Sequence, residues 1–469
     1  YGEAFERKID RIEGVQRAQL AGSARRRKES IGDLDVVAAV EKENIEKVTD
    51  SILSLPGIAE VKGAGDSKIS LILESTIFED TVSNSTIDGG VLAALGGEAW
   101  EELEANSTID AQVRLVPPHV FAYTMAYFTG SKEHNVRMRQ RALDMGYRLN
   151  EFGLFPLEGL GDAKGLLAAK NGLPAFEEEE IYEHLKMKWV PPEMREDMGE
   201  IEASLSGTLP SLIEPVQVKG ALHNHTTASD GSGSLIEMAD AAMDLGWEFL
   251  GIADHSEILN IGGRSIGVPQ HMVVEQGNEI REMNNKWEEE NTNFRLLHGS
   301  ECDILADGKL DYPDSIRREF SHVVGSVHAI GSWRNRDEIE NTEILIKAIE
   351  DPTFTILGHP TGRIIGGREG FPLDMHAVLR RMGELNSEGI LKACEINASP
   401  YRLDLDWRLC KFAKSQGVPI VINPDAHSIK GLKDVWFGVQ MARKGWLEEA
   451  DVLNCLPGNV IEERMMEGK

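Results

Sequence analysis

Apolar and polar positions follow a repeating order in the C-terminal half of the chain. From about Lys219 onward, short apolar runs alternate with amphipathic windows, and the runs lie at 249–253, 294–298, 322–327, 354–357 and 419–423. Strands that alternate with helices in this way are typical of a βα-repeat. The pattern therefore predicts a parallel sheet or barrel from about residue 219 to the end of the chain.

The N-terminal half has a different order. A helix-like window at 5–12 precedes strand-like runs at 17–21, 35–39, 68–73 and 112–116. Between the last two runs, Asn-Ser-Thr-Ile-Asp occurs twice, at 84–88 and 106–110, and we interpret this stretch as an insertion and not as a solenoid repeat. A basic helical window at 136–147 follows, and an acidic segment at 193–214 leads to the C-terminal half.

Composition narrows the class of protein. A chain of 469 residues has room for two or three domains, and it carries no apolar run near the roughly 20 residues of a membrane helix. The four scattered cysteines argue against a disulfide framework and predict a cytoplasmic protein. With a net charge of −29, contacts with nucleic acid must come from local basic patches. Because the chain begins at Tyr1 within helix-like sequence, we expect it to be N-terminally truncated.

Histidines and carboxylates recur at or just beyond the predicted strand ends of the C-terminal half. In an extended strand, residues i and i+2 share a face, so pairs such as His223 and His225 can reach one ion. Catalytic groups of a (β/α) barrel gather at this rim. The candidate metal ligands are His223, His225, Asp230, His255, Glu301, His328, His359, Asp425 and His427.

The residue types of this set indicate its chemistry. Imidazole together with carboxylate suits zinc, manganese or iron, and nine ligands suffice for two or three ions. Closely spaced ions lower the pKa of bound water and hold the attacking and leaving oxygens of a displacement at phosphorus. The set predicts a multi-metal phosphoesterase. The other histidines lack this placement and are interpreted as structural: His119, His134, His184, His271, His298, His322 and His376.

The motifs around these ligands resemble the polymerase-and-histidinol-phosphatase (PHP) family. They are His-Asn-His-Thr-Thr-Ala-Ser-Asp-Gly at 223–231, Asp-His-Ser at 254–256, Gly-His-Pro-Thr-Gly-Arg at 358–363 and Asp-Ala-His at 425–427. The resemblance implies a distorted (β/α)7 barrel over 219–469, with a site of up to three Mn²⁺ or Zn²⁺ ions held by the nine residues. Arg363 and Arg402 resemble basic positions near that site, for which phosphate binding and a salt-bridging role are both open.

A second dense motif lies at 22–35. Asp33 and Asp35 stand at i and i+2 where a loop enters a predicted strand, so both carboxylates project to one side. Such a pair suits two Mg²⁺ ions bound to a nucleoside triphosphate. Gly22 and Ser23 allow close approach of the backbone to phosphates, and Arg26 supplies positive charge.

The whole segment resembles the nucleotidyltransferase palm of family X DNA polymerases, and Tyr-Phe-Thr-Gly-Ser at 127–131 resembles the start of that family's thumb. The resemblance implies that Asp33 and Asp35 are catalytic with Mg²⁺. It also implies that DNA and deoxynucleotides contact Gly22, Ser23, Arg26, Gly32, Tyr127, Phe128, Gly130, Asn135 and Arg139.

One position departs from that family. Neutral Gln112 stands where a third carboxylate is expected, and it cannot serve as general base for a primer hydroxyl. Asp110 lies on the same strand face but falls within the predicted insertion. Two alternatives follow, which are a palm that adds nucleotides and a palm that only docks DNA.

Together these features predict an α/β multidomain protein. Its expected parts are a palm with a mixed sheet and helices at 1–127 (insertion about 78–110), a small α/β thumb at 128–192, a linker at 193–218 and the PHP barrel at 219–469. We expect a monomeric DNA repair enzyme acting as a 3′-5′ exonuclease on 3′ ends and gaps, without membrane association. The alternative is a small-molecule phosphatase of the histidinol-phosphatase type.

Overall fold

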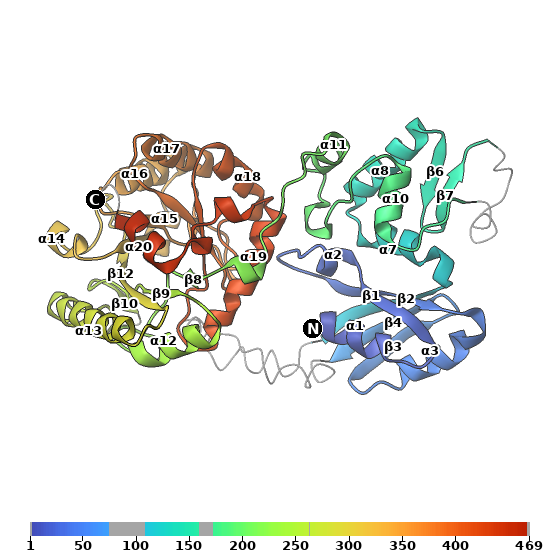
Figure 1. Ribbon diagram of the computed structural model, residues 1–469, viewed down its shortest axis with the longest axis horizontal. Helices are drawn as coiled ribbons and strands as arrows, with labels where there is room; N and C mark the ends of the chain where they lie inside the picture. Colours follow the sequence, from blue (N-terminus) through green and yellow to red (C-terminus); the bar gives the residue numbers. More distant parts are fainter. Residues whose placement is uncertain (1, 75–107, 159–171, 262, 467–469) are drawn as a thin grey trace. The chain divides into compact units, whose positions relative to one another are not determined.

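The computed structural model describes residues 2–74, 108–158, 172–261 and 263–466 (Figure 1). The chain divides into two compact units, of which the second begins at Pro210. In the described residues no helix combines the length and the apolar character that crossing a membrane requires.

The first unit is built on a five-stranded mixed sheet with strand order β1-β2-β5-β4-β3. Strands β2 and β5 are parallel, and the other neighbouring pairs are antiparallel. The elements of this part are α1 (Gly2–Asp10), β1 (Val15–Leu20), α2 (Gly22–Arg25), β2 (Asp33–Val40), α3 (Ile45–Leu53), β3 (Ile58–Ala64), β4 (Lys68–Glu74) and β5 (Thr108–Val116).

Side chains that alternate along β2 pack against different helices on the two faces of this sheet. Leu34, Val36 and Ala38 share a buried cluster with residues of α1 and α3. The opposite face, carrying Val37 and Ala39, packs against helix α7 (Phe121–Thr129). Since side chains alternate with a period of two, Asp33 and Asp35 belong to the α7 face.

The rest of the first unit is a smaller α/β part. After α7 come α8 (Lys132–Asp144), the hairpin of β6 (Tyr147–Asn150) and β7 (Gly153–Pro156), α10 (Glu178–His184) and α11 (Glu200–Ser206). Helix α8 begins at Ser131, whose hydroxyl accepts the backbone N–H of His134, as is typical of a helix N-cap. The predicted basic helix at 136–147 thus starts four residues earlier, and Tyr147 lies in β6.

The second unit is a nearly closed barrel of seven parallel strands, in the order β16-β15-β14-β13-β12-β9-β8. A parallel bridge between Asn224 and Ala426 joins the chain beyond β8 to the chain beyond β16. The strands are β8 (Gly220–Ala221), β9 (Phe249–Ile252), β12 (Arg295–Asp303), β13 (His322–Ser326), β14 (Ile356–Leu357), β15 (Ala393–Asn397) and β16 (Ile420–Asn423). This architecture confirms the predicted α/β class and the barrel.

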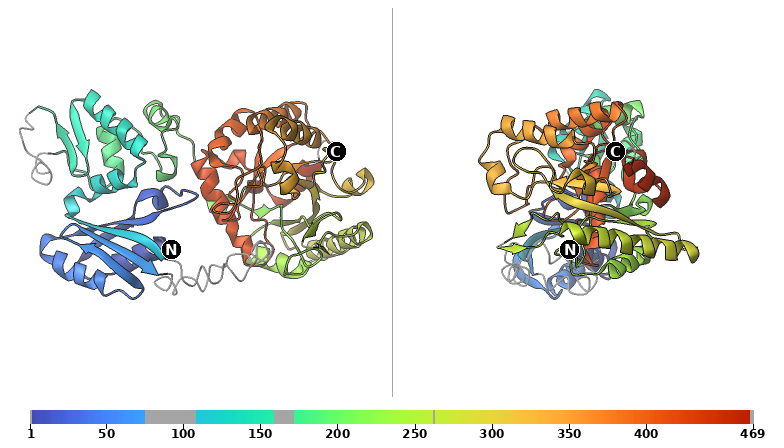
Figure 2. Two further views of the ribbon diagram at one scale, coloured as in Figure 1. Left: turned by 180° about the vertical axis from the view of Figure 1, so that it is seen from behind. Right: turned by 90° about the vertical axis from the view of Figure 1, so that its left-hand side faces the viewer.

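Helices cover the outside of the barrel, as Figures 1 and 2 show. They include α12 (Leu235–Asp244), α13 (Gln270–Glu289), α16 (Glu338–Ile349), α17 (Met375–Ser387), α18 (Trp407–Ser415) and α19 (Val435–Lys444). The second unit also contains α14 (Asp314–Arg317), α15 (Ile330–Arg334), α20 (Gly458–Met466) and a small hairpin of β10 (Asn260–Ile261) and β11 (Arg264–Ser265). Ser234 and Glu237 form a capping box that starts α12 directly after the loop from β8.

The structure changes the bounds of two predicted strands and adds two strands that were not predicted. Strand β12 runs to Asp303, so Glu301 lies within it and not after it. Strand β5 begins at Thr108, so Asp110 belongs to the sheet and not to an insertion that ends at residue 110. Strands β3 and β15 were not predicted. The remaining residues of the proposed insertion, 78–107, lie outside the described residues.

Candidate metal centre and carboxylate pair

The nine candidate ligands gather at the carboxyl end of the barrel. Parallel strands end at one rim, so residues at or just beyond successive strand ends are brought together although they are far apart in sequence. His223 and His225 follow β8, Asp230 lies on the loop before α12, His255 follows β9, Glu301 is in β12, His328 follows β13, His359 follows β14, and Asp425 and His427 follow β16.

Glu301 is the central carboxylate of this rim. It is almost fully buried. Its Oε2 lies 2.8 Å from His255 Nδ1 and 3.4 Å from His223 Nε2. Its Oε1 lies 2.9 Å from His359 Nε2 and 3.2 Å from His328 Nε2. Four imidazoles from four strand ends therefore converge on one carboxylate, which suits it to bridge ions.

Two further carboxylates hold the other side of the cluster. Asp230 Oδ1 lies 3.3 Å from His427 Nε2 and 3.4 Å from His255 Nε2. Asp425 Oδ1 lies 3.0 Å from His225 Nε2. Each imidazole thus has a carboxylate within reach, and no ligand candidate stands apart from the others.

The donor atoms fall into three overlapping groups in which all members lie within 4.8 Å of one another. His225 belongs to two groups and His255 to two, so the groups lie side by side. His359 joins them through Glu301. The groups are His225–Asp230–His255–His427, His223–His225–Asp425 and His255–Glu301–His328. This geometry fits two or three neighbouring ions.

Buried atoms without a partner support the same conclusion. His223 Nε2, His225 Nδ1, His359 Nδ1 and Glu301 Oε2 are buried without a hydrogen-bond partner among the described residues. An unpaired buried polar group costs about 1–3 kcal/mol. Ions bound between these atoms would remove that cost, so the side chains present fit a metal cluster.

The electrostatics of the cluster are those of paired opposite charges. Burial alone would lower the pKa of His255, His328 and His427, but neighbouring carboxylates raise them to about 9, 10 and 9. Burial would raise the pKa of Glu301 and Asp425, but the surrounding imidazoles hold both well below their usual range. In the metal-free protein His255, His328 and His427 therefore carry protons that a bound ion would displace, whereas burial lowers the pKa values of His225, to about 4, and of His359.

Some residues that support this centre were missed by sequence reasoning. Glu395 accepts a hydrogen bond from His223 Nδ1 at 2.8 Å, and Asp303 lies 3.1 Å from His328 Nδ1. Asp254 accepts bonds from the loop that carries Asp230. Glu395 stands between Cys394 and Ile396 in β15, and a charge between two apolar residues was the signal that could have indicated it.

The two arginines near the centre differ in their contacts. All of the Arg363 guanidinium is engaged, because Nη1 donates to Asp406 at 2.7 Å and Nε to the Arg402 carbonyl at 2.9 Å, while Nη2 donates to the Leu403 carbonyl. Arg402 is 11% exposed, and its Nε lies 3.9 Å from Asp425 Oδ2. Its Nε and Nη1 are buried without a hydrogen-bond partner in the described chain. Arg402, and not Arg363, is thus the cation that faces the metal centre.

In the first unit the two predicted catalytic carboxylates lie on β2. Asp35 is in register with Gln112 of β5, and Asp33 is in register with Asp110. Gln112 Nε2 donates to Asp33 Oδ2 at 3.4 Å. Burial and the charge of Asp33 raise the pKa of Asp35. Asp110 pairs instead with Lys62 at the exposed end of the sheet, so the third position beside the pair is held by a neutral amide.

The glycine-rich loop approaches this pair closely. Gly22 has φ +63, and a Cβ there would lie 2.7 Å from Asp35 Oδ2. Ser23 follows it in α2, while the space beside Gly32 is open to at least 4 Å. A side chain at position 22 would therefore press directly on one of the two carboxylates.

The guanidinium of Arg26 is already hydrogen-bonded within the protein. Its Nε donates to Glu196 at 3.0 Å and its Nη1 to the Thr129 carbonyl at 2.6 Å. Gly130, with φ +72, leaves room for this guanidinium, because a Cβ there would lie 3.0 Å from Arg26 Nη1. A phosphate would have to compete with Glu196 for Arg26.

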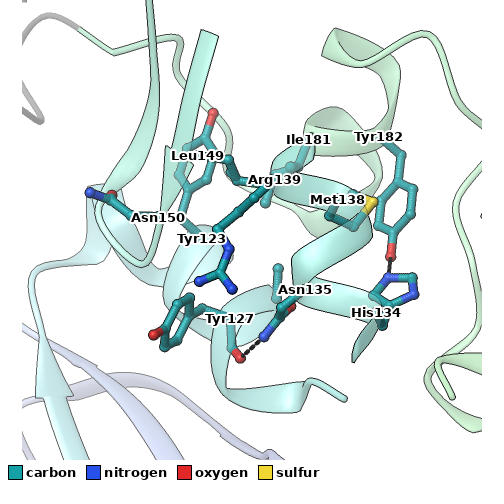
Figure 3. A pocket seen from close by; sticks show the side chains of 11 residues that line it. Tyr123, Tyr127, His134, Asn135, Met138, Arg139, Leu149, Asn150, Ile181 and Tyr182 are labelled. Carbon is teal, nitrogen blue, oxygen red and sulfur yellow. Dashed lines mark hydrogen bonds between the residues drawn. The ribbon is translucent and has the colours of Figure 1, made fainter. Parts of the chain in front are cut away.

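Of the other predicted nucleotide contacts, Tyr127, Asn135 and Arg139 line a narrow pocket of about 20 Å³ (Figure 3). Asn135 Nδ2 donates to the Tyr127 carbonyl at 2.7 Å, and Figure 3 shows the Arg139 guanidinium directed towards Tyr127. The Phe128 ring lies 3.6 Å from the Arg114 guanidinium carbon. The structure thus brings Tyr127, Asn135 and Arg139 together beside the start of α8.

Comparison with known proteins gives two kinds of relative. Residues 124–196 match the model of the DNA polymerase beta thumb. The chain is 35% identical to the DNA polymerase/3′-5′ exonuclease PolX of Bacillus subtilis over 96% of its own length and 69% of the relative. It is 27% identical to a probable phosphatase of Clostridium acetobutylicum and 30% identical to one of Caldanaerobacter subterraneus. Each of these matches covers 44% of this chain, and they cover 78% and 74% of those relatives.

Proposed function

Because the chain belongs to the family of the PolX-type DNA polymerase/3′-5′ exonucleases, we propose that it is a DNA repair enzyme that hydrolyses phosphate esters at DNA 3′ ends. The metal-ligand cluster at the barrel rim carries this proposal. The proposed parts are a palm at 1–127, a thumb at 128–192, a linker at 193–218 and a PHP phosphoesterase at 219–469.

The nine residues of the rim are proposed to hold up to three Mn²⁺ or Zn²⁺ ions. Bound there, such ions would lower the pKa of a water and neutralise charge that develops at phosphorus. Glu301, Asp230 and Asp425 suit the bridging positions, because each reaches at least two imidazoles. The mixed imidazole and carboxylate donors favour these metals over magnesium or calcium.

Arg402 is proposed to orient the reacting phosphate. A guanidinium presents a planar set of N–H donors that matches the oxygens of a phosphate group. Arg402 has two buried nitrogens without a partner in the described chain and stands beside Asp425. A substrate phosphate between Arg402 and the metal ligands would satisfy those donors.

The first unit is proposed to dock DNA, with nucleotide addition as the second candidate activity. Asp33 and Asp35 can hold Mg²⁺ with a deoxynucleoside triphosphate, and the thumb match supports a polymerase-type partner surface. Against synthesis stands Gln112, which supplies neither a third anionic ligand nor a base.

The proposal includes a cytoplasmic, monomeric enzyme. The four cysteines are free and buried, and none of them pairs. Free thiols are typical of a reducing compartment.

The test compares DNA with small phosphate monoesters. With Mn²⁺, a 5′-labelled primer–template and histidinol phosphate are offered separately, and we expect kcat/KM for the primer to be at least about 100-fold higher. Addition of EDTA should stop both reactions. Faster hydrolysis of the monoester would contradict the proposal and favour a small-molecule phosphatase.

A further inference from the structure

Glu395 lies in the middle of the barrel and touches two metal-ligand residues. It stands on β15 and is fully buried. Oε2 accepts His223 Nδ1 at 2.8 Å and Asn423 Nδ2 at 2.9 Å. Oε1 accepts the backbone N–H of His359 at 3.0 Å and Asn397 Nδ2 at 3.0 Å. Both oxygens thus face donors only.

We propose that Glu395 is a positioning residue that fixes His223 in the tautomer able to bind a metal ion, and that it also holds the turn carrying His359. The inference rests on the proposed metal centre. A carboxylate has about four acceptor positions, and all four are used here. Because Nδ1 of His223 is bonded to Glu395, Nε2 is the nitrogen directed at the site, and that atom lies 3.4 Å from both Glu301 and Asp425.

The same hydrogen-bond network includes a third candidate metal ligand, Asp425. Asn397 Nδ2 also donates to Asp425 Oδ2 at 3.0 Å. Asn423 cannot turn over freely, because its Oδ1 accepts the backbone N–H of Leu222 at 2.8 Å. The carboxylate of Glu395 therefore accepts hydrogen bonds from neighbours on or just beyond four strands, β8, β14, β15 and β16.

Glu395→Gln tests this direction without changing the shape of the side chain. An amide nitrogen at Oε2 would face His223 Nδ1 and Asn423 Nδ2, and at Oε1 it would face His359 N–H and Asn397 Nδ2. Either orientation opposes donor to donor. The backbone N–H of His359 cannot change role, whereas His223 can move its proton to Nε2, the atom that faces the ions.

The measurement is Mn²⁺ binding by the full chain, by equilibrium dialysis with metal analysis, alongside thermal unfolding of the metal-free protein. We expect Glu395→Gln to weaken binding of one ion by about 10–100-fold. Asp404→Asn is the matched control, since that buried carboxylate accepts Thr361 and Gly362 on one oxygen only and leaves room for an amide at the other. The control should bind Mn²⁺ within about twofold of the unsubstituted chain.

A double variant, Glu395→Gln with Asn423→Asp, separates positioning from folding. An aspartate at 423 accepts both Leu222 N–H and the new amide, so folding is restored while His223 keeps its proton on Nε2. We expect its unfolding temperature to match the unsubstituted chain and its Mn²⁺ affinity to stay low. Affinity equal to the unsubstituted chain in either variant would overturn the role of Glu395. Failure of the unsubstituted chain to bind Mn²⁺ or Zn²⁺ would instead overturn the metal centre itself.

Discussion

The barrel rim and the carboxylate pair of the first unit both place acidic side chains on parallel strands, but their surroundings differ. At the rim, five of the buried nitrogens and oxygens of His223, His225, His255, His359 and Glu301 have no hydrogen-bond partner in the described chain. Beside Asp33, the third position is taken by the amide of Gln112, and Arg26 is bonded to Glu196. The rim thus leaves buried donors and acceptors unpartnered, whereas the carboxylate pair is partly hydrogen-bonded by its own neighbours.

The difference in hydrogen bonding between the two regions shows which buried polar groups point to a bound ligand. A buried group costs free energy unless it is paired, so a cluster of unpaired donors and acceptors points to a bound ligand. Fully paired groups, such as Arg195 with Glu178, stabilise the fold instead. Substitutions and a pH series can test whether unpaired buried groups serve ligand binding and paired ones serve stability.

The largest effect is expected from His225→Ala. His225 belongs to two of the three ligand groups, so its loss removes a donor from two ions at once. We expect hydrolysis of DNA 3′ ends to fall by at least about 1,000-fold. The exposed His376 provides a matched control in the same barrel, and His376→Ala should leave the rate unchanged. Residual activity within tenfold would show that the rim is not the hydrolytic site.

A smaller effect, on stability, is expected from Glu178→Gln. Burial would raise the pKa of Glu178, but Arg195 and Arg25 hold it at about 2. With an ordinary value of 4.5, the folded pKa is depressed, so this contribution is present above pH 4.5 and is lost as the pH falls towards 2. From that shift we expect a loss of about 3 kcal/mol at pH 7.

Calorimetry of the full chain checks this, since only the transition of the first unit should move to lower temperature. Hydrolysis by the barrel at 25 °C serves as the control and should not change. A variant as stable as the unsubstituted chain would show that the Arg195–Glu178 pair does not stabilise the first unit.

The affinity of the barrel rim for Mn²⁺ is expected to depend on pH. The pKa values of His255, His328 and His427 are raised to about 9, 10 and 9, so below these values each imidazole must lose a proton before it binds an ion. Affinity for Mn²⁺ should therefore rise with pH between 7 and 9, by about tenfold per pH unit for each proton displaced. Dialysis at three pH values measures this. A flat profile would contradict the paired-charge description of the rim.

The smallest effect is expected from Gln112→Asp. It would place a third carboxylate beside Asp33 and Asp35 and complete the set that two Mg²⁺ ions prefer. We expect primer extension to increase by about tenfold over the unsubstituted chain. Asp110→Asn is the control, because that carboxylate pairs with Lys62, and it should have no effect. Extension that stays at the level of the unsubstituted chain would show that more than the missing carboxylate limits synthesis.

The sequence predicted the barrel, and the nine candidate ligands lie together at its rim, because strand ends and i, i+2 spacing are local features. It missed β15 and Glu395, since a five-residue strand that carries a glutamate and an asparagine has no local pattern that distinguishes it from a loop. It missed β3 because six of its seven residues are exposed and carry no alternation.

Contacts between residues that are far apart in the chain could also not be predicted from the sequence. The engagement of Arg26 by Glu196 and of Arg363 by Asp406 depends on packing across 170 and 43 residues. The motif at 22–35 predicts a phosphate site from its residue types, but it does not indicate that Arg26 is already bonded to Glu196 and Thr129.

A single gel assay tests whether the barrel hydrolyses the 3′ end of a DNA primer. A 5′-labelled primer annealed to template is incubated with the chain, Mn²⁺ and all four deoxynucleotides, beside His225→Ala. We expect bands shorter than the primer in the first lane and an unchanged primer in the second. Bands longer than the primer would show that the carboxylate pair works despite Gln112, and an unchanged primer in both lanes would contradict the assignment of DNA as the substrate of the barrel.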